Sequence, residues 1–361
     1  MINLILDSHA RELATKLDGL PLALATAGAY LSQVSTSLVD YLRYYNSSWL
    51  RLQETSPELS SYEDRALYST WNISYKHIHS RNESAGKLLQ LWAYFDNQDL
   101  WYALLAGGSK CSPEWFSTII DDELNFNEAI RLLCDHALVE SHGVSGGYGM
   151  HSCVHAWIMH VLNSERDISM AKLALNCVSS AIPDKTVLEY WALQRRLLPH
   201  ASRCLELVYD ASIFDLENSD HILNAAYNLG ILYSDQGKMK EAEEMYLRAL
   251  TGKEKAWGPE HTSTLNTVNN LGNLYWNQGK MKEAEEMYLR ALTGYEKVWG
   301  LEHKRSLDTT YNLAVMYKKR LMFKDAAKHF ELVVQGYTKI LGPEHSETVE
   351  ALDQWKGCKD K

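Results

Sequence analysis

The residues QGKMKEAEEMYLRALTG stand at Gln236–Gly252 and occur again, without a change, at Gln278–Gly294. The two copies are 42 residues apart. Motifs outside them keep the same spacing: Asn228, Asn270 and Asn312 each begin an Asn-Leu-Gly or Asn-Leu-Ala triplet, and His261, His303 and His345 each end a Gly-Pro-Glu-His or Gly-Leu-Glu-His linker. Self-similarity at a fixed period of this size indicates stacked structural repeats.

Each repeat predicts two helices. In the middle unit, small and large apolar residues share one face of each helix, namely Val268, Leu271, Gly272 and Tyr275 on the first and Ala284, Tyr288 and Ala291 on the second. Gly279 separates the two helices, and Trp299-Gly300 ends the pair. The small residues at 272 and 284 allow close helix approach, and we expect the tyrosines to fill the space beside them.

This pattern resembles the tetratricopeptide repeat (TPR) in its longer, kinesin-light-chain-like form. The resemblance covers roughly residues 219–350 and implies an α-solenoid of three units. The third unit departs from the pattern: Leu321 stands at the turn glycine, and Phe330 and Val333 replace a tyrosine and an alanine. Because the replacements are apolar, we expect this unit to keep its fold.

Composition limits the class of protein. The 361 residues are enough for two or three domains, and 46% hydrophobic residues are enough for ordinary cores. A net charge of −10 argues against a general binder of nucleic acid or anionic membranes. The six cysteines are scattered without a Cys-x-x-Cys pair, and no stretch reads as a signal peptide or a membrane span, so we expect a cytoplasmic protein with reduced thiols.

Residues 1–80 predict helices with short polar joints. The stretch ELATKLDGLPLALATAGAYL places Pro21 in the first turn of an apolar helix. It resembles the helical subdomain of NB-ARC-type (STAND) signalling ATPases, in which the proline of the Gly-Leu-Pro motif packs against adenine. The resemblance implies that role for Pro21; the alternative is an ordinary first-turn proline.

Residues 81–165 predict a winged helix. Helical patterns at 85–95 and 127–137 precede a hairpin of 138–141 with 148–151. The segment GYGMHSCVHAWIMHVL then resembles the Met-His-Asp motif that closes the NB-ARC module in fungal proteins with kinesin-light-chain-like repeats. In that family the histidine contacts the β-phosphate of ADP, which implies this role for His151. Ser152 replaces the aspartate, which weakens the expected latch.

Three other interpretations compete for this segment. DNA binding is disfavoured because the would-be recognition helix carries only Arg131 as a base and the wing carries none. A zinc site at His151, Cys153 and His155 lacks a second ligand pair at metal-site spacing. His151 can also be a packed histidine without a ligand.

No Gly-Lys pair in the chain is followed by Ser or Thr, so the phosphate-binding loop of an NTPase is missing. The chain thus resembles the C-terminal part of a fungal-type NB-ARC protein, with the P-loop core missing. Pro21 and His151 would be half of a nucleotide site, and ADP or ATP is expected only if that core is present elsewhere. We expect no catalytic residue, no metal and no resident cofactor in this chain.

Residues 166–218 are helical without the 42-residue pattern and predict a bridge or cap, bent near Pro199, that precedes the repeats at 219–361. In the repeats, Asn228, Asn270 and Asn312 line the expected groove of the first helices. Each amide can clamp an extended peptide or can hold the neighbouring repeat. Trp276 lies on a second groove line, as an exposed anchor or as a core residue.

The fold expectation is a mainly α protein with a helical subdomain, a winged helix and a TPR-type solenoid. The functional expectation is a non-catalytic adaptor or sensor that binds a peptide of another protein, with no nucleic-acid or membrane partner. Two alternatives stay open. One is part of a nucleotide-switched ATPase whose P-loop lies upstream or on another chain. The other is a cargo adaptor like kinesin light chain, although no heptad coiled coil is visible.

Overall fold

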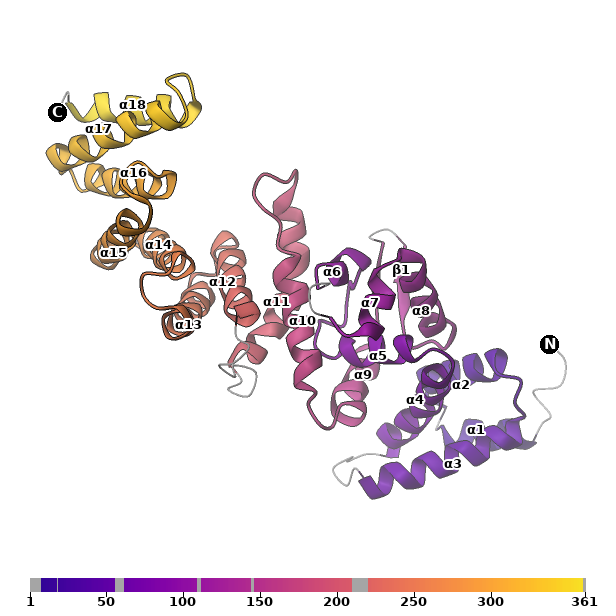
Figure 1. The fold of residues 1–361 in the computed structure, drawn as a ribbon. Coiled ribbons are helices and arrows are strands. Elements are labelled where there is room, and N and C mark those ends of the chain that lie inside the picture. Colours follow the sequence, from indigo (N-terminus) through magenta and orange to yellow (C-terminus); the bar gives the residue numbers. More distant parts are fainter. Residues whose placement is uncertain are drawn as a thin grey trace. The chain divides into compact units, whose positions relative to one another are not determined.

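The computed structural model describes residues 8–17, 19–55, 62–108, 112–143, 146–209 and 220–359. The chain forms two compact units, residues 1–213 and 214–361, and each is described by itself. The described part is mainly α-helical and contains one two-stranded hairpin (Figure 1).

The first unit begins with four helices: α1 (Ser8–Lys16), α2 (Pro21–Gln33), α3 (Leu38–Thr55) and α4 (Tyr62–Arg81). Pro21 is the first residue of α2, where the missing N–H has no intrahelical partner to lose. Ser37 caps α3, because its Oγ accepts the Asp40 N–H at 3.1 Å. The predicted helices of this region are thus present.

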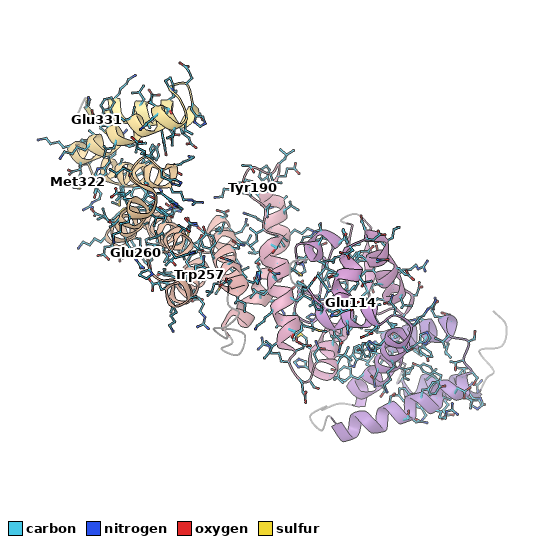
Figure 2. All side chains as sticks on the ribbon, in the orientation of Figure 1. Glu114, Tyr190, Trp257, Glu260, Met322 and Glu331 are labelled. Carbon is cyan, nitrogen blue, oxygen red and sulfur yellow. The ribbon has the colours of Figure 1, made fainter. Side chains whose placement is uncertain are left out.

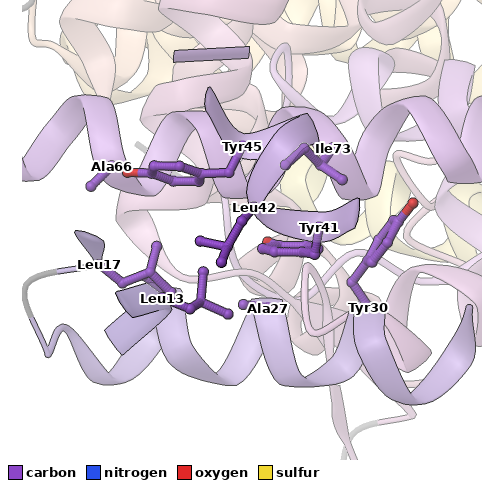
Figure 3. Close-up of a cluster of buried hydrophobic side chains, with 10 residues drawn as sticks. Leu13, Leu17, Ala27, Tyr30, Tyr41, Leu42, Tyr45, Ala66 and Ile73 are labelled. Carbon is purple, nitrogen blue, oxygen red and sulfur yellow. The ribbon is translucent and has the colours of Figure 1, made fainter. Parts of the chain in front are cut away.

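Tyrosines and small residues make up the core between these helices. Figure 3 shows Tyr30, Tyr41 and Tyr45 converging with leucines and alanines from all four helices. The Tyr45 hydroxyl donates to the Lys16 carbonyl at 3.2 Å. Tyr45 thus packs its ring in the core while its hydroxyl keeps a hydrogen-bond partner. One face of the helix after Gly19, with Ala23, Ala27 and Tyr30, is therefore the inner face of a small helical bundle, while Leu24 is exposed.

The next elements are short helices around a hairpin: α5 (Glu83–Trp92), α6 (Tyr102–Ala106), α7 (Glu114–Ile120), α8 (Glu123–Asp135), β1 (Glu140–His142), β2 (Gly147–Gly149), α9 (Ser152–Trp157) and the π-helical turn η1 (Ile158–Leu162). The strands pair antiparallel with Glu140 opposite Gly149, and Leu100 bridges Tyr148. The predicted hairpin starts too early. The Leu138 N–H bonds to the Leu133 carbonyl and closes α8, so pairing begins at Glu140.

Two helices complete the first unit: α10 (Ile168–Ser180) and α11 (Tyr190–Tyr209), with Pro199 inside α11. Arg196 of α11 donates two hydrogen bonds of 2.7 Å to the carboxylate of Asp99. Its guanidinium carbon also lies 3.9 Å from the centre of the Trp101 ring. These contacts attach α11 to the loop between α5 and α6.

The second unit consists of helix pairs that follow one another: α12 (Asp220–Asp235) with α13 (Met239–Trp257), α14 (Thr262–Asn277) with α15 (Met281–Trp299), α16 (Lys304–Lys319) with α17 (Phe323–Ile340), and then α18 (Ser346–Lys359) (Figure 1). Gly237 and Gly279 make the turns inside the first two pairs with φ of 73° and 77°. Leu321 adopts the same left-handed conformation, with φ of 62°.

The linkers between pairs use histidine to begin the next helix. The Nδ1 atoms of His261 and His303 each accept the N–H two residues later at 3.2 Å. Figure 2 labels Trp257 and Glu260, which mark the first of these linkers. The regular spacing of the Gly-Pro-Glu-His motif along the chain therefore reflects helix capping.

The predicted role of the small residues is confirmed. A Cβ added to Gly272 would lie 2.7 Å from the ring of Tyr288, and one added to Gly230 would lie 2.6 Å from the ring of Tyr246. In the third pair, Ala314 and Phe330 are both fully buried in the same positions. The helices of each pair therefore touch through one small residue and one ring.

Helix α18 was not predicted, because its buried positions are small residues with a weak periodicity: Thr348, Ala351 and Cys358. It packs against α17 in the place of the first helix of a further unit. Within the described ranges, no helix combines the length and apolarity needed to cross a membrane. Every cysteine in these ranges is a free thiol.

Candidate functional site

The candidate site lies on the first helices of the pairs, α12, α14 and α16. Asn270 of α14 donates from Nδ2 to the hydroxyl of Tyr227 on α12 at 2.9 Å. Asn312 of α16 donates from Nδ2 to Oδ1 of Asn273 on α14 at 3.2 Å. Each amide thus holds the preceding repeat with one donor.

A pocket of about 250 Å³ lies between α14, α15 and α16. It is lined by two residues singled out from the sequence, Trp276 and Asn312, and by Asn273, Asn277, Tyr288, Tyr311 and Val315. Amide, hydroxyl and aromatic groups therefore meet in one hollow of the second unit. In a ligand pocket, such polar groups can orient a bound peptide backbone while the aromatic groups bury an apolar side chain of the peptide.

Sequence reasoning missed most of the residues that line this pocket. Asn273 and Asn277 follow Asn270 by three and seven positions, so helical periodicity places them on the same face. Tyr311 and Val315 are four residues apart on α16, as Asn273 and Asn277 are on α14. The sequence signal for these residues is their helical spacing from the predicted asparagines.

Trp276 has two functions, which correspond to the two interpretations from sequence. It is half-buried and packs against the core cluster that contains Leu313, Tyr317 and Phe330. It also lines the pocket, and Lys319 places its ammonium 4.9 Å from the ring centre. Trp276 is thus a rigid wall of the pocket, held in place by the core behind it.

Hydrogen bonds inside the pocket set the direction of one amide. Oδ1 of Asn273 accepts from the Tyr288 hydroxyl at 2.7 Å and also from Asn312. This arrangement leaves the Nδ2 group of Asn273 as a donor on the pocket side of the network. Burial raises the pKa of Tyr288, so its hydroxyl stays protonated and keeps donating.

The two residues that resemble nucleotide contacts are both exposed in the first unit. Pro21 is the first residue of α2, and His151 precedes α9. Nδ1 of His151 accepts the Cys153 N–H at 3.2 Å, which is the capping contact that the linker histidines also make. A capping histidine that accepts through Nδ1 carries its proton on Nε2, where it can donate to a further group.

The geometry separates the residues of the zinc interpretation. His155 is buried, and its Nε2 lies 3.1 Å from the Phe95 carbonyl and 3.3 Å from that of Trp92. His151 and Cys153 are exposed. Across the described residues, no group of three or more His, Cys, Asp or Glu side chains is arranged to hold a metal ion. His155 instead ties α9 to the end of α5.

Models of the tetratricopeptide repeat match residues 221–297 and 306–347. The helix pairs and their small-to-ring contacts lie within these ranges. The second unit is a TPR solenoid. This identification covers the groove residues of α12, α14 and α16, and TPR proteins as a class bind other proteins.

A curated relative is similar to a larger part of the chain. It is a nucleotide-binding leucine-rich repeat (NLR)-like protein of Hyaloscypha variabilis, 27% identical over 275 residues. The match covers 72% of this chain and 26% of the relative, so the chain spans about a quarter of that protein's length. The similarity extends beyond the TPR solenoid, because 275 residues exceed its length.

Two solved structures have a low similarity to this chain. One holds the nearly identical TPR-like repeats of a putative kinesin light chain from Podosopora anserina; it is 18% identical, with a TM-score of 0.43 over 54% of this chain and 88% of that one. The other is a Signal Transduction ATPase with Numerous Domains (STAND) protein with a TPR sensor from Pyrococcus horikoshii. It is 13% identical, with a TM-score of 0.33 over 94% of this chain and 63% of that one.

Proposed function

We propose that this chain is a non-catalytic interaction module of an NLR-like protein and that its TPR groove binds an extended peptide segment of another protein in the cytoplasm. The pocket between α14 and α16 carries the proposal. It combines an aromatic wall, Trp276, with amide groups of Asn273 and Asn312 whose orientation the framework holds. An extended backbone offers the carbonyl and N–H groups that such amides pair with.

The test uses peptides that are selected from a random library for binding to the full chain. Val315 lines the pocket, and Val315→Arg would fill it. Leu332 on α17 is 53% exposed and lies outside the pocket, so Leu332→Arg is the matched control. We expect fluorescence polarisation to show at least a tenfold loss of affinity for Val315→Arg and no loss for Leu332→Arg. Equal binding by both variants would overturn the proposal.

A second candidate function follows from the NLR-like relative. In this proposal, the chain is part of a nucleotide-switched protein in which Pro21 and His151 contact ADP. Both residues are exposed, and Nε2 of His151 is free to carry a donor proton. An immunoblot of the endogenous protein tests it. A band clearly above 41.2 kDa, with ADP-dependent stability that His151→Ala removes, supports the proposal. A band near this mass contradicts it.

A further inference from the structure

Aromatic rings join the helical bundle of α1–α4 to the elements that follow it in the first unit. The ring centre of His136, at the end of α8, lies 5.4 Å from that of His77 on α4 and 6.1 Å from that of Tyr30 on α2. Figure 3 shows Tyr30 at one edge of the bundle core. In a second contact, the ring centre of Trp157 on α9 lies 5.8 Å from that of Trp71 on α4. We call the contact made by these five residues the bundle joint.

The bundle joint buries polar atoms that lack hydrogen-bond partners. His136 is fully buried, and among the described residues neither of its ring nitrogens has a partner. The same is true of Nε2 of His77 and of the indole Nε1 atoms of Trp71 and Trp157. Native proteins leave few buried polar groups unpaired, because each such group has given up its hydrogen bonds to water. Opening the joint would return these hydrogen bonds, which an apolar core does not gain on opening.

The surroundings of two further buried histidines in the first unit differ from those of His136. Nε2 of His155 lies within hydrogen-bond distance of two backbone carbonyls. Nε2 of His200 lies 3.3 Å from the Asp99 carbonyl, and its Nδ1 accepts the Asp96 N–H at 3.2 Å. A carbonyl accepts from a protonated imidazole as it does from a neutral one. A proton added to His136 has no such acceptor among the described residues.

The groups around His136 do not compensate a positive charge. His77 of α4 and the neutral phenol of Tyr30 of α2 face its ring. Arg81 lies one turn after His77 on α4. Burial and then the neighbouring His77 lower the pKa of His136 to about 4, although the exposed Asp135 acts in the opposite direction. Burial and then Arg81 also lower the pKa of His77. A proton on either ring therefore places a charge in a buried site that already has a basic neighbour.

We propose that the bundle joint is a proton-sensitive contact: a proton taken up by His136, with His77 beside it, separates the end of α8 from α2 and α4 and releases the bundle from the elements that follow. The two histidines supply the charge, and the unpaired polar atoms lower the cost of exposing the contact to water. The proposal concerns the first unit and does not rest on peptide binding by the TPR groove.

The direction of the response follows from proton linkage. The closed joint holds His136 with a pKa of about 4, and an open joint exposes it as an ordinary histidine with a pKa of 6.5. The open form binds more protons between these two values, so the closed joint is fully stable above pH 6.5 and loses stability as the pH falls toward 4. The ratio of open to closed joints should rise by up to about tenfold per pH unit in this window for one histidine.

The experiment is hydrogen–deuterium exchange of the full chain from about pH 7.5 to about pH 4.5, with rates corrected for the intrinsic pH dependence of exchange. We expect protection of peptides from α4 and the end of α8 to fall by up to about tenfold per pH unit below pH 6.5. Peptides from α14 and α15 of the same molecule should keep their protection. Constant protection of the joint, or an equal fall in α14 and α15, would overturn the proposal.

Substitutions locate the proton. His136→Phe keeps a ring of similar size and cannot take up a proton, so it should remove the pH dependence of the joint. His136→Gln carries no titratable group either and replaces it, with the same expectation, if His136→Phe does not fold. His160 in η1 is exposed, so His160→Phe is the matched control and should respond like the wild type. A wild-type response in the His136 variants, or an equal loss of response in His160→Phe, would overturn the proposal and leave His155 and His200 as the source of any acid response.

Discussion

The two copies of the identical block occupy different environments, although their 17 residues are the same. In the first copy, Glu243 pairs with Lys280 and Gln278 of the next unit. In the second, Glu285 pairs with Arg320 and Tyr317. Tyr246 lies beside Asn270, and Tyr288 donates to Asn273. The comparison teaches that the block determines its helix, while the residues of the following unit determine what its polar groups contact.

The largest test of this comparison removes the shared tyrosine from each copy. Tyr246 and Tyr288 are 3% and 2% exposed, so Tyr246→Ala and Tyr288→Ala should each lower the free energy of unfolding by about 3–5 kcal/mol. Only Tyr288 lines the pocket. We therefore expect peptide affinity to fall for Tyr288→Ala and to persist for Tyr246→Ala at temperatures where both are folded. Urea unfolding and fluorescence polarisation measure the two quantities, and equal loss of binding would contradict the assignment.

The next test makes the first copy like the second at the position that follows the block. Lys253→Tyr should raise the free energy of unfolding by roughly 2–3 kcal/mol, because it removes a buried charge that forms no ion pair among the described residues. Asn224 stands where Asn266 accepts from Tyr295, so an acceptor is in place. Thermal and urea unfolding give the change. A loss of stability would show that the hydrogen bond from Lys253 to the Thr267 hydroxyl outweighs the desolvation of the charge.

The pH dependence of the wild type and this variant is a separate prediction. The pKa of Lys253 is about 8 in the folded protein and 10.5 for an ordinary lysine, so between these values the unfolded chain binds more protons. Stability of the wild type must then rise with pH in that window. The advantage of Lys253→Tyr should be full below pH 8 and should shrink toward pH 10.5. A difference that stays constant from pH 7 to 10 would contradict the buried charge.

The third unit offers a smaller test at its turn. Leu321 is 73% exposed and adopts a φ of 62°, where Gly237 and Gly279 stand in the other units. The left-handed conformation costs a residue with a Cβ about 1–2 kcal/mol, and glycine avoids this cost. Glycine in turn loses about 0.5–1 kcal/mol more conformational entropy on folding, which offsets part of the gain. Leu321→Gly should therefore stabilise the chain by up to about 1 kcal/mol. The reverse change, Gly279→Leu, should destabilise it by a similar amount, and urea unfolding of both variants checks the two signs.

The smallest effect concerns the ion pairs that distinguish the two copies. Side chains of Glu243 and Glu285 are about a quarter exposed, and their partners are more exposed. Glu243→Gln and Glu285→Gln should each cost about 0.2–1 kcal/mol, and the cost should fall at high salt. A double-mutant cycle of Glu285 with Arg320 measures the pair. A coupling that persists at high salt would contradict a screened surface ion pair.

Part of this protein could be predicted from its sequence. The 42-residue period, the turn glycines and the small-to-ring pairs led to the TPR solenoid, because period and close packing are local properties of the chain. The helices of residues 1–80 followed from apolar spacing and the start signal at Pro21. The same reasoning chose Asn312 and Trp276, which do line the pocket.

Other features were decided only by the tertiary structure. The hairpin begins at Glu140 because the Leu138 N–H bonds to the Leu133 carbonyl at the end of α8. Helix α18 has a weak sequence pattern and packs against α17. The sequence has glutamates close to Lys253 along the chain, so it does not predict a buried lysine without an ion pair. The fold shows that Lys253 is buried and that, among the described residues, it donates to the Thr267 hydroxyl and not to a carboxylate. Helix and period depend on neighbours within a few residues, whereas counter-ions, amide directions and pockets depend on residues brought together from different repeats.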